Sequence, residues 1–188
     1  MLEAAVRVFA RDGVAEARID AIAAEAGVSV GTVYNVYGDR AGLVAAVLDA
    51  GRQQFIELVR AYFESSDGVD FEPRLRGLVR LLVGHMRAHW PMLQMLAQAR
   101  ATPPCGPTPA TGAPLVVREL HGHLSALVRQ GVEAGAVGEV DVHVATCALM
   151  GAIRNTIDVD LTLGLDAPSE SRADAIVQIF LEGVARRP

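Results

Sequence analysis

Hydrogen-bonding side chains crowd one short segment near the N-terminus. Residues 27–43 read GVSVGTVYNVYGDRAGL, where polar side chains lie among small and apolar ones. The hydroxyls of Ser29 and Thr32 suit phosphate oxygens, and the amide of Asn35 suits the edge of adenine. Val30 suits contact with a thymine methyl group, and Gly31 would let the backbone come close to a duplex. The segment therefore predicts a surface that binds DNA.

Two short helices must position this segment. Apolar residues repeat at helical spacing over residues 19–26, and Gly27 predicts the end of that helix because glycine tolerates a positive φ. Ser29 predicts the N-cap of a second helix, which Gly38 and Asp39 end. Two helices joined by a short turn form a helix-turn-helix, whose second helix lies in the major groove of DNA. Its N-terminal end offers free N–H groups to phosphate.

The same residues resemble the N-terminal domain of the TetR family of bacterial transcriptional regulators. The resemblance covers roughly residues 1–45 and is densest at Ile22-Ala23, Ala26-Gly27-Val28-Ser29, Gly31-Thr32-Val33-Tyr34, Tyr37 and Leu43. It implies an all-helical homodimer with a small-molecule pocket in its C-terminal domain. Ligand binding there would shift the helix that leaves the DNA-binding domain and release the operator. Thr32 and Tyr34 resemble phosphate contacts of the family, Asn35 a variable base-facing position, and Arg40 the usual lysine near backbone phosphate.

Three departures from the family pattern predict few phosphate contacts. Ala17 and Arg18 stand where Ser or Thr usually opens the second helix, although Arg18 itself could touch phosphate. Val36 replaces a polar or aromatic residue, and the chain begins at the first helix without a basic tail. Residues 1–50 hold four arginines and seven acidic residues, a net charge of −3. Because the salt dependence of binding scales with the number of phosphate contacts, we expect modest operator affinity and a shallow salt dependence.

The rest of the chain predicts further helices, with neither a strand nor an internal repeat. The expected fold is all-α, with about nine helices: an N-terminal helix-turn-helix DNA-binding domain (1–45), then a helical ligand-binding and dimerisation domain (46–188). In the first helix, Leu2, Ala5, Val6 and Phe9 have the spacing of a buried face. The other predicted helices span residues 19–26, 30–37, 40–65, 73–90, 92–100, 115–134, 142–163 and 173–184, and a Pro-rich loop spans 101–114.

Soft and aromatic side chains gather between residues 86 and 96. Such residues suit an adaptable apolar ligand pocket and equally suit an ordinary core. Arg154, on an apolar helix, could bind the polar end of a ligand, lie at a dimer interface or pair with Asp158. The predicted pocket residues are Met86, Trp90, Met95, Leu96, His121, Met150 and Arg154. They favour a small, largely apolar effector.

Histidines and cysteines raise two further hypotheses, a metal site and an enzyme. His85 and His89 have the spacing of a zinc-binding pair, but His121 and His123, two residues apart, point to different sides of a helix. We therefore expect no metal site and no cofactor.

A nucleophile pair is the second hypothesis. His143 and Cys147 lie four residues apart, yet neither a glycine-rich elbow nor a carboxylate accompanies them. Buried cysteine is commonly a small hydrophobe. Cys105, in the Pro-rich loop, could be an exposed thiol. We expect a protein that is not an enzyme.

Composition limits the location and suggests the assembly. The chain has 188 residues, 51% of them hydrophobic, with two cysteines and a net charge of −5. Neither a membrane span nor a signal peptide is evident, so a reducing cytoplasm is expected. The last two helices are apolar over more surface than one chain covers, which predicts a homodimer through these helices. A two-fold dimer would place its recognition helices about 34 Å apart, one turn of the duplex.

These features predict a ligand-responsive transcriptional regulator, a repressor that a small apolar effector releases from a palindromic double-stranded operator. The alternative is a helical small-molecule-binding or interaction module that has lost DNA binding. The acidic N-terminal region favours this alternative, because DNA attracts basic surfaces.

Overall fold

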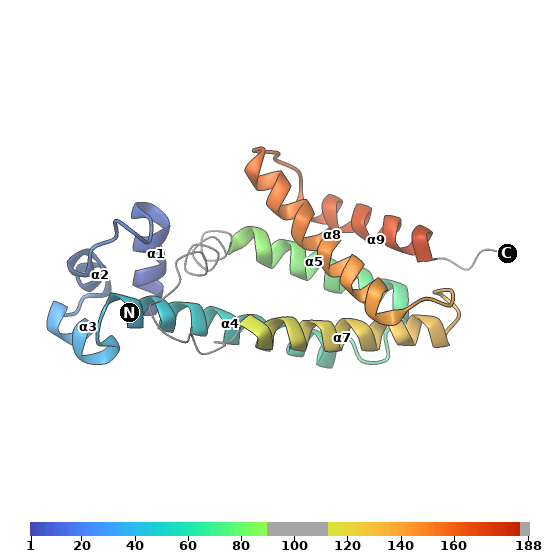
Figure 1. The fold of residues 1–188 in the computed structure, drawn as a ribbon, viewed down its shortest axis with the longest axis horizontal. Helices are drawn as coiled ribbons and strands as arrows, with labels where there is room; N and C mark the ends of the chain where they lie inside the picture. The colour runs from blue at the N-terminus through green and yellow to red at the C-terminus, as the bar shows by residue number, and fades with distance from the viewer. Residues whose placement is uncertain (90–112, 185–188) are drawn as a thin grey trace. The chain divides into compact units, whose positions relative to one another are not determined.

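The computed structural model describes residues 1–89 and 113–184, and within these ranges it contains helices and no strand. The all-helical prediction is confirmed, and Figure 1 shows the order of the helices. They are α1 (Leu2–Asp12), α2 (Ile19–Ala26), α3 (Val30–Tyr37), α4 (Arg40–Ser65), α5 (Phe71–Ala88), α7 (Ala113–Glu133), α8 (Val142–Thr162) and α9 (Ser169–Val184). The helix predicted at 92–100 and most of the predicted loop at 101–114 lie outside the described residues.

The chain divides into two compact units. Met1–Phe55 belongs to the first, and Ile56–Ala88 together with the chain from Pro114 onward forms the second. The domain boundary expected at residue 45 stays a prediction. Among the described residues, no helix combines the length and the apolar character that crossing a membrane requires.

One apolar cluster holds the first unit together. It joins α1, α2, α3 and the start of α4, with Ala5, Val8, Phe9, Ile22, Ala23, Val33, Leu43 and Val47 all buried. The predicted inner face of α1 is wrong at Val6, which is 37% exposed, whereas Val8 is fully buried. The buried positions of α1 are 4, 5, 8 and 9, a stripe that the 3.6-residue period keeps on one side of the helix. Val6 lies outside this stripe.

Local signals end and begin the short helices as expected. Gly27 ends α2 in the left-handed conformation (φ 67°, ψ 30°), and its N–H donates to carbonyls of the last turn. Ser29 then caps α3, its Oγ accepting from the N–H of Thr32 at 3.1 Å. At the start of α2 Arg18 provides no side-chain cap.

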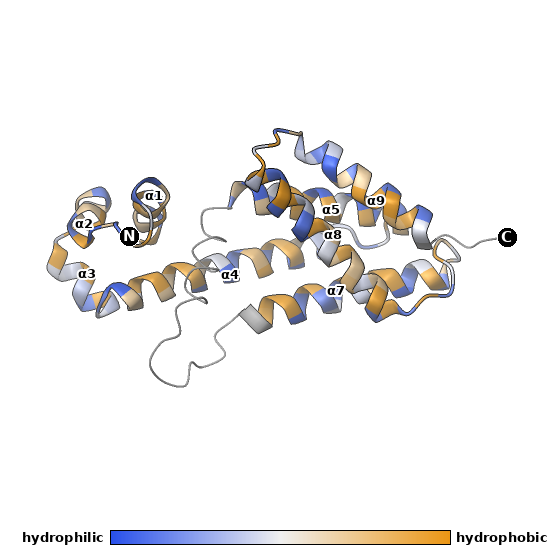
Figure 2. Cartoon of the chain, turned by 45° about the horizontal axis from the view of Figure 1, so that its top comes forward, coloured by the Kyte–Doolittle hydropathy of each residue, from blue (hydrophilic) through white to orange (hydrophobic). Residues whose placement is uncertain are grey.

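The second unit is a packed group of helices. α5 packs along α9, and α8 packs against both. In Figure 2 hydrophobic residues form stripes along these helices, with hydrophilic residues on their other sides. The buried stripe predicted for α8 is confirmed, because Ala145, Leu149, Ile153 and Ile157 are all buried. Leu75, Leu78 and Leu82 of α5 and Ala173 and Val177 of α9 are buried as well, and α5, α8 and α9 pack against one another.

A buried carboxylate joins the ends of α8 and α9. Asp160 is 3% exposed and accepts two hydrogen bonds from Arg172, from Nε at 2.7 Å and from Nη2 at 2.9 Å. Arg87, on α5, lies 3.6 Å from the same carboxylate. A buried charge is tolerated only when it is paired in this way. The ion pairs of Asp160 with Arg172 and Arg87, called here the Asp160 clamp, therefore fix the turn between α8 and α9.

Candidate DNA-binding site

The outer face of α3 carries the residues predicted to contact DNA. Val33 is buried on the inner side, whereas Val30 and Tyr34 are 39% and 47% exposed. Gly31 and Asn35 are exposed as well. The expectation that this helix presents its small and polar residues to solvent is confirmed, although their contacts with DNA stay predictions.

Two hydroxyl groups at the N-terminus of α3 are already bonded to each other. The Oγ of Ser29 lies 2.8 Å from the Oγ1 of Thr32. Two hydroxyls carry two hydrogens, and their mutual bond uses one of them. The other remains available to a phosphate oxygen. No acidic residue lies in the first turn of α3, so the positive end of the helix dipole is not neutralised there.

Arg18 is exposed but paired with an acid. Its Nε and Nη2 donate to the two carboxylate oxygens of Asp20, at 3.1 and 2.8 Å. The hydrogen bonds from Arg18 hold the pKa of the Asp20 carboxyl below its usual value, and those to Asp20 raise the pKa of Arg18. A phosphate must therefore compete with Asp20 for this guanidinium.

Arg40 also has a hydrogen-bond partner within the protein. It is half-buried, and its Nη2 donates to the backbone carbonyl of Val14, between α1 and α2. On α1, Arg7 pairs with Glu25 at 2.8 Å and Arg11 with Asp12 at 2.7 Å. These internal partners explain physically why the first unit offers little positive charge to DNA.

The predicted ligand-pocket residues are only partly within the described structure. Trp90, Met95 and Leu96 lie outside it. Met86 on α5, His121 on α7 and Met150 on α8 are half-buried, and Arg154 is exposed. The pocket stays a prediction.

A surface hollow on the second unit has a different character from the predicted pocket. It lies along α5 and α9 and is lined by charged and polar residues that include Glu72, Arg76, Asp174 and Gln178. Of the predicted pocket residues that the structure describes, none lines this hollow. A hollow lined by charged groups does not suit an apolar effector, so we do not assign the effector to it.

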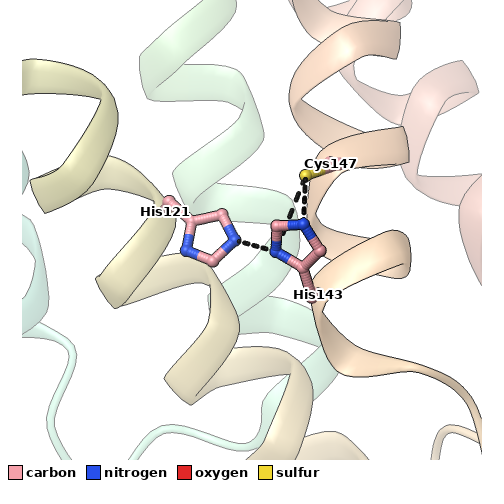
Figure 3. A group of neighbouring side chains, drawn as sticks. All are labelled: His121, His143 and Cys147. Atoms are coloured by element: carbon pink, nitrogen blue, oxygen red, sulfur yellow. Dashed lines mark hydrogen bonds between the residues drawn. The ribbon is translucent and has the colours of Figure 1, made fainter. Parts of the chain in front are cut away.

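The second unit also brings together three residues that sequence reasoning kept apart. His121 of α7 meets His143 and Cys147 of α8, with His121 Nε2 2.9 Å from His143 Nδ1 (Figure 3). For a metal site, the sequence offers His121 only as a further ligand for the His85 and His89 pair, and it pairs His143 only with Cys147. Helical spacing reports which residues share a face of one helix, but not where two helices meet. The sequence feature that points toward this cluster is the pair His143 and Cys147, four residues apart on one helix.

Comparisons with known proteins point to one family. The family model described as "Bacterial regulatory proteins, tetR family" matches residues 1–47. A curated relative, the HTH-type transcriptional repressor SCO4008 of Streptomyces coelicolor, is 34% identical over 96 residues. That match covers 51% of this chain and 45% of the relative, so the chain spans about half the length of the curated relative.

Solved structures share the fold over nearly the whole chain. The fatty acid degradation regulator FadR of Bacillus halodurans has a TM-score of 0.74 at 21% identity, with 97% of each chain covered. FadR of Bacillus subtilis has a TM-score of 0.76 at 17% identity, also with 97% of each chain covered. PfmR of Thermus thermophilus has a TM-score of 0.73 at 20% identity, with 98% of each covered. The chain therefore matches the tetR family model in its N-terminal part, residues 1–47, and shares the helical fold of these solved regulators.

Proposed function

We propose that this protein is a ligand-responsive transcriptional regulator that binds a palindromic operator through α3 and is released from it by a small, largely apolar effector. The observation that supports this proposal most strongly is the exposed face of α3. A helix packed in a hydrophobic core would bury its small and apolar residues. In α3, by contrast, Val30, Gly31 and Asn35 are exposed to solvent. That face suits major-groove contacts to bases, while the capped N-terminus suits phosphate.

A homodimer through α8 and α9 would bring two copies of α3 to one duplex. Apolar side chains on these helices remain exposed in the single chain: Val144 is 59% exposed, Val159 50% and Ile179 71%. Pairing α8 and α9 with their copies in a four-helix arrangement would bury such residues. The two-fold axis of that dimer would match a palindromic site.

The effector would act through the second unit. The Bacillus subtilis regulator of this fold is described in complex with stearoyl-CoA, which supports an effector with a large apolar part for this chain as well. To weaken operator binding roughly 100-fold, the effector must favour the released state by about 2.7 kcal/mol. We place this activity in the cytoplasm, where the operator lies.

A helical ligand-binding module without DNA binding is the second candidate function. The pairing of Arg7, Arg11 and Arg18 with acidic residues favours it, because these ion pairs reduce the attraction to a polyanion.

Selection from a random duplex pool at low salt separates the two candidates. If the protein is a DNA-binding regulator, a palindromic sequence should be enriched. If it is a ligand-binding module without DNA binding, no sequence should be enriched. Replacing Thr32 and Tyr34 together by alanine should abolish the enrichment without lowering the melting temperature, because Ser29 still caps the backbone N–H of residue 32. Val117→Ala, an exposed change on α7, serves as the control and should leave the enrichment intact. Enrichment that survives the double substitution would show that α3 is not the contact surface.

A further inference from the structure

The meeting point of α7 and α8 gathers three side chains whose donor atoms metals prefer. His121, His143 and Cys147 each offer one such atom, and these atoms lie within 4.8 Å of one another (Figure 3). His143 and Cys147 are exposed and His121 is half-buried, so an ion from solvent can reach them. Imidazole nitrogen and thiolate sulfur are the common protein ligands of zinc.

The spacing of the three groups fits a tetrahedral ion. With Zn–N bonds of about 2.0–2.1 Å and a Zn–S bond of about 2.3 Å, two nitrogens lie about 3.3 Å apart and nitrogen and sulfur about 3.6 Å apart. Here His121 Nε2 and His143 Nδ1 are 2.9 Å apart, and Cys147 Sγ lies 3.8–4.0 Å from the ring nitrogens of His143. The donor atoms of His121 and Cys147 lie within 4.8 Å of each other, so side-chain movements of about 1 Å would bring the three groups around an ion.

A hydrogen-bond chain fixes which nitrogen of His121 can bind an ion. Thr146 Oγ1 donates to the carbonyl of Val142 at 2.7 Å, which uses its only hydrogen. Ser125 Oγ, 3.2 Å from Thr146 Oγ1, must therefore donate to it. Ser125 then accepts from Nδ1 of His121, 3.4 Å away, so Nδ1 carries the proton and Nε2 keeps its lone pair toward His143. Metal-bound histidines are commonly oriented by such a partner on their other nitrogen.

We propose that His121, His143 and Cys147 form a zinc(II) site, with a water in the fourth position. His121 binds through Nε2 and Cys147 through its thiolate, so the thiol proton is released when the ion binds. His143 binds through Nδ1, whose proton moves to Nε2 of the same ring through solvent, so the ion replaces the hydrogen bond between His143 and His121. The site lies entirely within the second unit and does not depend on DNA binding. In this proposal His121 binds the metal ion and does not line the predicted apolar pocket.

Cobalt(II) and zinc(II) titrations of the reduced, full-length chain test this site without DNA. Cobalt bound to a thiolate gives a charge-transfer absorption in the near ultraviolet, and we expect that band to saturate at one ion per chain. Cys147→Ser should remove the band, and Cys105→Ser, the matched control, should leave it unchanged. A band that survives Cys147→Ser, or that Cys105→Ser removes, would overturn the proposal.

Competition with a chromophoric chelator measures the zinc affinity of the same variants. His143→Gln should weaken zinc binding by at least about tenfold, while His123→Gln should leave it unchanged. Ser125→Ala should weaken zinc binding about 10- to 100-fold but keep the cobalt–thiolate band, since it alters only the orientation of His121. Circular dichroism of the metal-free variants establishes that each is folded. Equal zinc affinity in the wild type and in His143→Gln would mean that the cluster is only a set of hydrogen bonds between two helices.

Discussion

A substitution at Gly31 can test whether the backbone of α3 lies close to DNA without disturbing the fold. A Cβ added there would meet only the Oγ of Ser29, at an ordinary contact distance of 3.7 Å. Gly31→Ala should therefore leave the melting temperature unchanged or slightly higher, because alanine favours helix. If the backbone of α3 lies against the duplex, the added methyl group should lower operator affinity by about tenfold or more, measured by fluorescence anisotropy.

Gly122→Ala is the matched control for this change. Gly122 lies on α7, is exposed, and has nothing within 4 Å of an added Cβ. Both variants should be at least as stable as the wild type, and only Gly31→Ala should bind DNA more weakly. Unchanged operator affinity in Gly31→Ala would place the duplex elsewhere on the molecule.

Asp20 limits the contribution of Arg18 to DNA binding. Asp20→Asn removes the carboxylate that holds the guanidinium, so Arg18 becomes available to a phosphate. We expect operator affinity to rise several-fold at low salt. The slope of log affinity against log salt should become steeper by about 1 for each Arg18 that reaches a phosphate.

Glu3→Gln removes the same charge from the first turn of α1 and is the comparison for Asp20→Asn. If both substitutions raise the affinity equally, the effect is one of net charge and Arg18 has no role of its own.

At the residue scale, features with a local cause could be predicted from the sequence. The Ser29 cap and the left-handed Gly27 depend on neighbours a few residues away, so their roles could be read directly. The bond from Arg40 to the carbonyl of Val14 joins positions 26 residues apart, and the cluster of His121 with His143 joins two helices. Such contacts depend on how helices pack, which residue spacing does not encode.

At the scale of elements, the Asp160 clamp should hold α8 and α9 together. Asp160→Asn removes the charge that accepts two bonds from Arg172, while the shape of the side chain is kept. Because Arg172 is partly exposed and regains water, we expect a loss of about 2 kcal/mol in the free energy of unfolding. Urea denaturation measures it.

Asp158→Asn, on the exposed side of the same helix, should change the free energy of unfolding by less than about 0.5 kcal/mol. Equal effects of the two substitutions would mean that the buried ion pair does not stabilise the fold.

Helix positions were predictable because hydrophobic spacing and capping residues are strong along this chain. The stripe of α8 was correct at each of its four positions, since a long helix averages over many residues. The inner face of α1 was misplaced at Val6, because alanine and valine at neighbouring positions fit two stripes almost equally well. Only the packing against α2 selects between them.

At the scale of the whole molecule, DNA binding should require the dimer. Ile179 is 71% exposed on α9, and a charge there would oppose burial against a second copy. Ile179→Glu should shift the protein toward a monomer in analytical ultracentrifugation and weaken binding to a palindromic operator. Val117→Glu, equally drastic but on α7, should remain a dimer. A dimeric Ile179→Glu protein would contradict the proposed interface.

The acidic first unit should also show in the salt dependence of the complex. Its arginines are largely paired with acids of the same unit, so few of them can replace counterions on DNA. We expect a slope of log affinity against log salt clearly shallower than about −10, the value for a protein with some ten phosphate contacts. A slope near that value would show that these ion pairs open on the DNA.

Methylation protection on the selected duplex tests the central claim most directly, that α3 enters the major groove. Guanine N7 lies in that groove, so a bound α3 should shield it from the methylating reagent. We predict protection in two half-sites whose centres lie about 10 base pairs apart, and loss of protection when Thr32 and Tyr34 are both alanine. Bound protein that leaves every guanine N7 open to methylation would contradict the account.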